Sequence, residues 1–155
     1  MSPTKLRISL DYHGVIDRDF AFWRRFSCLA HHQGHQFAVV SGGPAVEIRD
    51  QLKYQRIVYD YLWCVLDYCL ATGKAAMLPT GEFRIRDDDW NQAKAFLCTQ
   101  SQISLHVDDS PSYARWFTLP YCLCRPSSRT CLDQNGRLLS FSSPSELLCQ
   151  IEQMF

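Results

Sequence analysis

The sequence lacks several features that would narrow its class at once. It carries no net charge, because 16 basic residues balance 16 acidic ones, so no overall field favours nucleic acid or a membrane surface as a partner. No apolar run is long enough to cross a membrane, and the first ten residues lack the apolar core of a signal peptide. We therefore expect a cytoplasmic protein that does not interact with membranes, and nothing in the charge points to nucleic acid.

Metal-binding cysteine motifs are also missing. The chain has eight cysteines but no CxxC pair, and Cys122 and Cys124 form only a CxC. The histidine-rich run at 31–35 falls where a helix should end, so the spacing predicts no structural zinc site. Without a signal peptide, the cysteines are expected to be reduced thiols that pack as small apolar side chains.

What is present is a regular alternation of apolar strands and amphipathic helices over 155 residues, which we read as one domain, 1–155. The predicted strands lie at 5–12, 36–41, 61–66, 103–107 and 121–125. Periodicity leaves a helix open for 57–70. Helical spacing separates the strands, and this order predicts an α/β fold: a three-layer, Rossmann-like domain with a mainly parallel central sheet flanked by helices.

Polar side chains follow three of the predicted strands. Asp11 follows the first, Ser41 closes the second, and Asp108 and Asp109 follow a later one. Ligands of open parallel sheets bind beyond the carboxyl ends of the strands, so these residues are expected to converge. Clustered carboxylates are stable when a hard cation such as Mg2+ bridges them, and Asp11 would then be placed to attack a phosphoryl group. The alternative is that these residues only cap the helices that follow the strands.

The order of these residues resembles the four motifs of the haloacid dehalogenase-like superfamily. The resemblance rests on Asp11-x-His13-Gly14-Val15, on Ser41 in "FAVVSG", on a later lysine and on "ISLHVDDS", and it covers about residues 5 to 117. It implies a Rossmann-like core, a Mg2+ site and phosphoryl transfer through an aspartyl-phosphate.

By this resemblance, Asp11 is the nucleophile and a metal ligand, and Ser41 binds the transferring phosphoryl group. Asp109 is the principal second ligand, Asp108 is its acidic partner, and the backbone carbonyl of His13 is a further ligand. Lys74, in "ATGKAAM", is our choice for the lysine of the third motif. The other lysines considered, Lys53 and Lys94, lie within helical patterns and are predicted to point to solvent.

His13 departs from the family pattern, because phosphatases of the family usually have a second aspartate at this position. Imidazole can act as acid and base near neutral pH, so His13 is our candidate for proton transfer. The alternatives are a different reaction on the same scaffold, or a degenerate protein that keeps the metal site and binds without turnover. Asp17 is expected to cap the first helix and has no predicted catalytic role.

The spacing of the motifs leaves no room for a large cap domain. Each interval, from Asp11 to Ser41 and from Ser41 to Lys74, holds about one helix with its connections. By resemblance, capless members leave an open site that suits a macromolecular phosphorylated substrate, or they close it by homo-oligomerisation. The aromatic segment 54–68 fits either an interface or an ordinary buried strand and helix.

Overall fold

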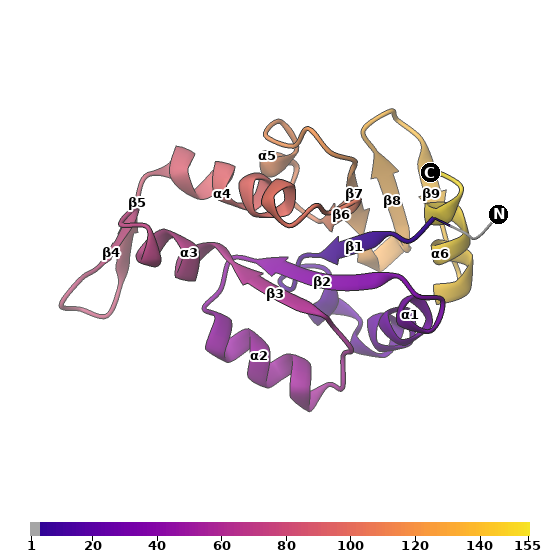
Figure 1. Cartoon of the computed structure of the whole chain (residues 1–155), viewed down its shortest axis with the longest axis horizontal. Helices are drawn as coiled ribbons and strands as arrows, with labels where there is room; N and C mark the ends of the chain where they lie inside the picture. Colours follow the sequence, from indigo (N-terminus) through magenta and orange to yellow (C-terminus); the bar gives the residue numbers. More distant parts are fainter. Residues whose placement is uncertain (1–3) are drawn as a thin grey trace.

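The computed structural model describes residues 4–155 as an α/β domain (Figure 1). Its elements, in chain order, are β1 (Arg7–Leu10), η1 (Ile16–Arg18), α1 (Phe20–His32), β2 (Gln36–Ser41), α2 (Ala45–Tyr54), β3 (Tyr61–Cys64), α3 (Val65–Ala71), β4 (Ala75–Met77), β5 (Phe83–Ile85), α4 (Asp87–Gln100), β6 (Leu105–Asp108), α5 (Pro111–Ala114), β7 (Tyr121–Arg125), η2 (Pro126–Ser128), β8 (Thr130–Asp133), β9 (Leu138–Ser140) and α6 (Pro144–Glu152).

The central sheet has seven strands in the order β3-β2-β1-β6-β7-β8-β9. The first five strands in this order run parallel, and β8 and β9 continue the sheet antiparallel at one edge. Leu10 of β1 pairs with Val39 on one side and with Val107 on the other. The predicted α/β, Rossmann-like architecture with a mainly parallel sheet is therefore confirmed.

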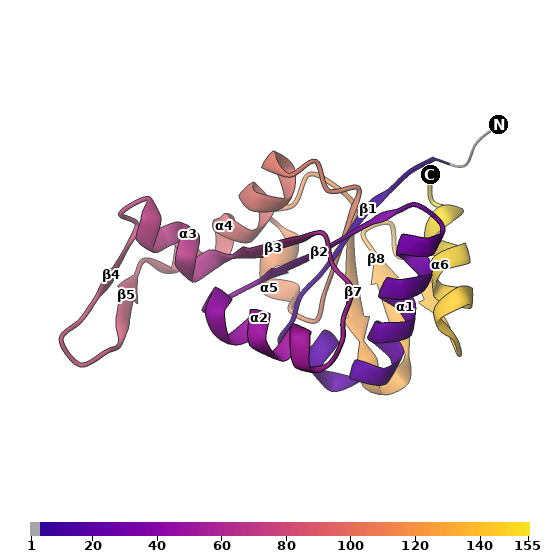
Figure 2. The ribbon, with the colours of Figure 1, turned by 60° about the horizontal axis from the view of Figure 1, so that its bottom comes forward.

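Helices cover both faces of this sheet (Figures 1 and 2). One apolar cluster contains Phe26 of α1, Leu52 of α2 and Leu148 of α6, and a second, on the opposite face, packs Cys98 of α4 against Val40 of β2. The parallel strands are buried on both faces because helices cover both, which explains their nearly continuous apolar sequences.

The strand order places the predicted site residues side by side. β1 lies between β2 and β6. The carboxyl ends of these three strands therefore bring together Asp11, Ser41 and Asp108. The Asp11 N–H continues the ladder by donating to the Val107 carbonyl at 2.9 Å. No cap domain is inserted after β1 or β2 among the described residues.

Three features differ from the expectation or extend it. Residues 57–70 contain both a strand and a helix, because β3 runs directly into α3. The segment between α3 and α4 forms a two-stranded hairpin, β4–β5, which projects from the body of the domain (Figure 2). The sequence did not predict this hairpin or strands β8 and β9. No helix within residues 4–155 is long and apolar enough to span a bilayer.

Candidate active site

Three carboxylates gather at the carboxyl ends of β1 and β6. Asp11, Asp108 and Asp109 each offer one oxygen, and these oxygens all lie within 4.8 Å of one another. Asp11 and Asp108 are 5% and 0% exposed, whereas Asp109 reaches solvent. Carboxylates this close repel each other unless positive charge lies between them.

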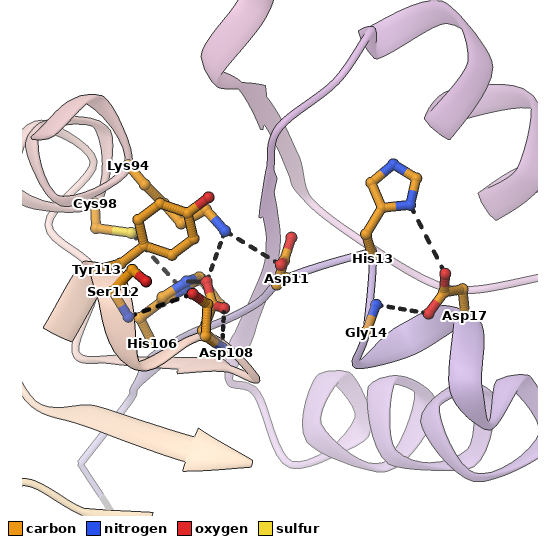
Figure 3. Close-up of polar contacts among 12 residues, drawn as sticks. Asp11, His13, Gly14, Asp17, Lys94, Cys98, His106, Asp108, Ser112 and Tyr113 are labelled. Atoms are coloured by element: carbon orange, nitrogen blue, oxygen red, sulfur yellow. Dashed lines mark hydrogen bonds and ion pairs between the residues drawn. The ribbon is translucent and has the colours of Figure 1, made fainter. Parts of the chain in front are cut away.

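A buried lysine supplies part of that charge (Figure 3). The Nζ atom of Lys94, on α4, lies 3.2 Å from Asp11 Oδ2 and 2.6 Å from Asp108 Oδ2. The side chain is only 2% exposed. Burial alone would lower the pKa of Lys94, but the two carboxylates raise it to about 12, so this lysine is a permanent cation.

The prediction that Lys94 points to solvent was therefore wrong, and the choice of Lys74 is not supported. Lys74 is exposed, and its Nζ lies 5.5 Å from the centroid of the Tyr68 ring, outside the carboxylate cluster. The sequence did contain a signal for Lys94. Trp90, Lys94 and Cys98 are spaced four apart, which places them on one helix face, and Cys98 is fully buried.

Two polar atoms at the centre of the site have no partner among the described residues. They are Asp11 Oδ1 and Ser41 Oγ, both on buried side chains. An unsatisfied buried polar atom costs about 1–3 kcal/mol, so such atoms call for an explanation. Burial raises the pKa of Asp11, Lys94 and the adjacent Ser41 hydroxyl lower it, the charge of Asp108 raises it, and the net direction is upward. A cation bound to the Asp11 carboxylate would hold it ionised.

Contacts within the protein fix the orientation of the Asp108 carboxylate. Its Oδ2 lies 2.6 Å from Lys94 Nζ and 3.2 Å from His106 Nε2, and its Oδ1 accepts from the Ser110 N–H at 2.9 Å. Burial would raise the pKa of Asp108, but the hydrogen bond from His106 and the charge of Lys94 hold it well below its usual value. Asp108 therefore orients Lys94 and remains ionised.

His106 is a site residue that the sequence analysis missed. It is fully buried, its Nδ1 lies 2.7 Å from Ser9 Oγ, and its ring stacks on Phe117 with centroids 5.1 Å apart. Burial lowers the pKa of His106, but the Cys98 sulfur and the Asp108 carboxylate raise it to about 9. The available signal was the two-residue period of a strand, which puts His106 and Asp108 on the same face.

Asp109 is placed by a close approach of the loop after β1. Gly14 has φ +84, and a Cβ added there would overlap the Asp109 carboxylate. The Gly14 N–H donates to Asp17 Oδ1 at 2.7 Å, which fixes this turn. Asp17 thus anchors the loop and does not cap α1; that cap is Asp19, whose Oδ1 accepts from the Phe22 N–H.

His13 does not join the cluster in this conformation. Its side chain is 58% exposed, and its Nδ1 lies 3.7 Å from Asp17 Oδ2. Figure 3 shows the imidazole directed away from Asp11. The ligand role of its backbone carbonyl remains a prediction.

The donor set fits a hard divalent cation. Mg2+ prefers carboxylate and carbonyl oxygens, and the carboxylates of Asp11, Asp108 and Asp109 provide oxygen atoms only. Asp11 Oδ1 is buried and without a partner among residues 4–155. These residues would hold Mg2+ beside the unpartnered Ser41 hydroxyl.

Comparisons with known proteins do not assign the chain. No protein family and no curated protein matches the sequence. Among solved structures, the chain is similar to a glycosyltransferase from Rickettsia africae ESF-5, with 11% sequence identity and a TM-score of 0.39. The match covers 76% of this chain and 29% of the glycosyltransferase. A likeness at this level carries no argument about activity, so the function must be inferred from the site itself.

Proposed function

We propose that the protein is a Mg2+-dependent phosphoric-ester hydrolase of the haloacid dehalogenase-like type, with Asp11 as the nucleophile. The observation that carries this proposal is the Asp11 carboxylate: Oδ2 faces Lys94 at 3.2 Å, while Oδ1 is buried and free of partners among the described residues. An oxygen that is held in place but not hydrogen-bonded is suited to attack an electrophile.

In the first step, Asp11 Oδ1 attacks the phosphorus atom of the substrate and forms an aspartyl-phosphate. The bond from phosphorus to the leaving oxygen breaks, and that oxygen takes up a proton. Ser41 Oγ donates to a phosphoryl oxygen, and the Lys94 ammonium stabilises the charge that develops beside Asp11. When bound by Asp11, Asp108 and Asp109, Mg2+ would neutralise the charge of the phosphoryl oxygens.

In the second step, water attacks the aspartyl-phosphate, releasing inorganic phosphate and regenerating the Asp11 carboxylate. This step needs a base, and the first needs an acid. His13 lies two residues after Asp11 and is the proposed proton carrier. Because its imidazole now faces Asp17, proton transfer requires the side chain to rotate toward Asp11. The absence of a cap domain among residues 4–155 suits a phosphoryl group carried by a large substrate.

One observation favours a second candidate, a binding protein that keeps the metal site without turnover. His13 is exposed and faces Asp17, so the proposed proton carrier does not lie beside Asp11 in this conformation. Such a protein would bind Mg2+ and phosphate but would not hydrolyse esters.

Hydrolysis of an aryl phosphate in the presence of Mg2+ distinguishes the two. We expect the wild type to be active, Asp11→Asn to lose at least about a hundredfold in kcat, and the control Asp88→Asn, at an exposed position of α4, to match the wild type. Equal hydrolysis by the wild type and Asp11→Asn would refute the nucleophile. Mg2+ binding by calorimetry without any hydrolysis would favour the binding protein.

A further inference from the structure

A cavity of about 590 Å3 opens beside the carboxylate cluster, between the loop after β1 and the turn after β7. Its lining includes Gly14, Arg18, Asp109, Ser127 and Arg129. Asp109 belongs to both the cluster and the cavity wall, so the cavity adjoins the proposed metal site. It is large enough to receive the part of a substrate that lies beyond its phosphoryl group.

One wall of this cavity is rigid. The Arg129 guanidinium donates to Asp19 Oδ2 and to the Ser142 carbonyl, both at 3.0 Å, and it lies over the Phe22 ring at 5.1 Å. Asp19 in turn caps α1. The charges of Arg129 and Asp19 therefore cancel, and the remaining N–H groups of the guanidinium are held in a fixed position.

Arg18, which also lines this cavity, has no strong partner within residues 4–155. Its nearest carboxylate is Asp17, at 4.0 Å from Nε, and its side chain is 71% exposed. With Mg2+ bound, the divalent ion, Lys94 and the protonated His106 would more than balance the carboxylates of Asp11, Asp108 and Asp109. Arg18 would then add a further positive charge in the cavity.

A cavity on the other side of the loop after β1 is lined by acidic side chains. It measures about 510 Å3, and its lining includes His13, Asp17, Glu47 and Asp50. Three carboxylates would repel an anionic group there. The two cavities therefore discriminate by charge, and an anion is directed to the side of Arg18.

We propose that the cavity at Arg18 binds a second oxyanion of the substrate, a carboxylate or a further phosphate attached to the leaving group. This inference rests on the proposed phosphatase function and names its substrate class: phosphate esters of acidic compounds. The Arg18 guanidinium would pair with the oxyanion in the two-pronged geometry that arginine favours, with Ser127 and Arg129 lining the same cavity.

Calorimetric titration of the full chain with Mg2+ and two non-hydrolysable ligands tests this proposal. Phenylphosphonate probes the phosphoryl site alone, and 4-carboxyphenylphosphonate adds the second oxyanion. The wild type should bind the carboxylated ligand about tenfold more tightly. Arg18→Ala and Arg18→Gln should abolish that preference, while Arg24→Ala, an exposed arginine of α1 outside the cavity lining, should keep it.

Equal binding of both ligands by the wild type, or an unchanged preference in the Arg18 variants, would overturn the proposal. If phenyl phosphate is nevertheless hydrolysed in an Asp11-dependent manner, only the second oxyanion site fails. If neither phosphonate binds the wild type, the phosphoryl site fails and this inference fails with it.

Discussion

Lys94 is fully buried and permanently charged. A protein tolerates such a residue only when opposite charges offset the cost of removing it from water. The compensation comes from Asp11 and Asp108, whose carboxylates contact the ammonium directly. The Tyr113 ring adds a weaker contact, with its centroid 4.3 Å from Nζ. The three charged residues form one electrostatic unit, and removing any one of them exposes the other two to the full cost of burial.

Replacement of Lys94 by methionine should therefore destabilise the protein, although methionine fits the apolar surroundings. Two buried carboxylates would lose their counter-charge, and the expected loss is about 3–5 kcal/mol in the free energy of unfolding. Urea denaturation measures it, with the exposed Lys53→Met as the matched control. Combining Lys94→Met with Asp108→Asn should recover part of the loss. A Lys94→Met protein as stable as the control would contradict this account.

Because of His106, the free energy of unfolding should fall as the pH becomes alkaline. Its pKa is about 9 in the folded protein and near 6.5 in an unfolded chain. The protonated ring therefore stabilises the fold fully below about pH 6.5, and this contribution is lost as the pH rises toward 9. The loss should be on the order of 3 kcal/mol.

Urea denaturation in EDTA at several pH values checks the role of His106. The wild type and His32→Gln, an exposed histidine, should lose stability over this range, whereas His106→Gln should lack that slope. Parallel pH profiles for all three proteins would show that His106 does not titrate in this way.

At the scale of elements, the loop after β1 matters more than its length suggests. It carries His13, brings the Gly14 backbone against Asp109, and is held by the hydrogen bond from the Gly14 N–H to Asp17. The same loop separates the cavity at Arg18 from the acidic cavity at Asp17, Glu47 and Asp50. Under the proposed function, its conformation would control both the metal ligands and the path of the substrate.

Gly14→Ala should reduce Mg2+ affinity by at least about tenfold, because the new methyl group would displace the Asp109 carboxylate. Gly81→Ala provides a matched control. Gly81 has φ +86, close to the φ +84 of Gly14, but nothing lies within 4 Å of its added Cβ. Both variants pay the same backbone strain, and only Gly14→Ala should change the affinity measured by calorimetry. Equal affinities would rule out a ligand role for Asp109.

Element by element, the sequence predicted the parts of the fold that carry strong periodicity. The strand at 36–41 appears as predicted. Antiparallel β8 was missed because Cys131 and Asp133 are buried while Leu132 is exposed, so its alternation does not follow polarity. The β4–β5 hairpin was missed because each strand has only three residues.

The sequence predicted the acidic residues and the serine of the site, but not its buried lysine and histidine. The alternation of strands and helices predicts a parallel sheet, and the carboxyl ends of parallel strands lie at one end of the sheet. The residues that follow β1, β2 and β6 therefore meet there: Asp11, Ser41 and the Asp108–Asp109 pair. Lys94 and His106 were not identified, since both are polar residues in buried positions and polarity argues for the surface. Only tertiary contacts with Asp108 explain why these two side chains lie inside.

For the molecule as a whole, the carboxylate cluster should link stability to Mg2+. An ion that binds only the folded state raises the free energy of unfolding by RT ln(1 + [L]/Kd), which is about 2.7 kcal/mol at a hundredfold excess over Kd. The melting temperature should therefore rise with Mg2+ concentration and saturate, and Asp109→Asn should weaken the effect. NaCl at the same ionic strength serves as the control. An equal rise with NaCl would show screening rather than binding.

His35 joins Leu6 to Glu152 at the end of the sheet opposite this cluster. The buried imidazole accepts from the Leu6 N–H through Nδ1, at 3.1 Å, and its Nε2 lies 2.9 Å from Glu152 Oε1. This joins the start of β1 to the end of α6, at the amino edge of the sheet (Figure 1). Polypeptide fused at either end would leave the domain on the side opposite the carboxylate cluster. A molecule tethered to a surface by either terminus would therefore direct this cluster away from the surface.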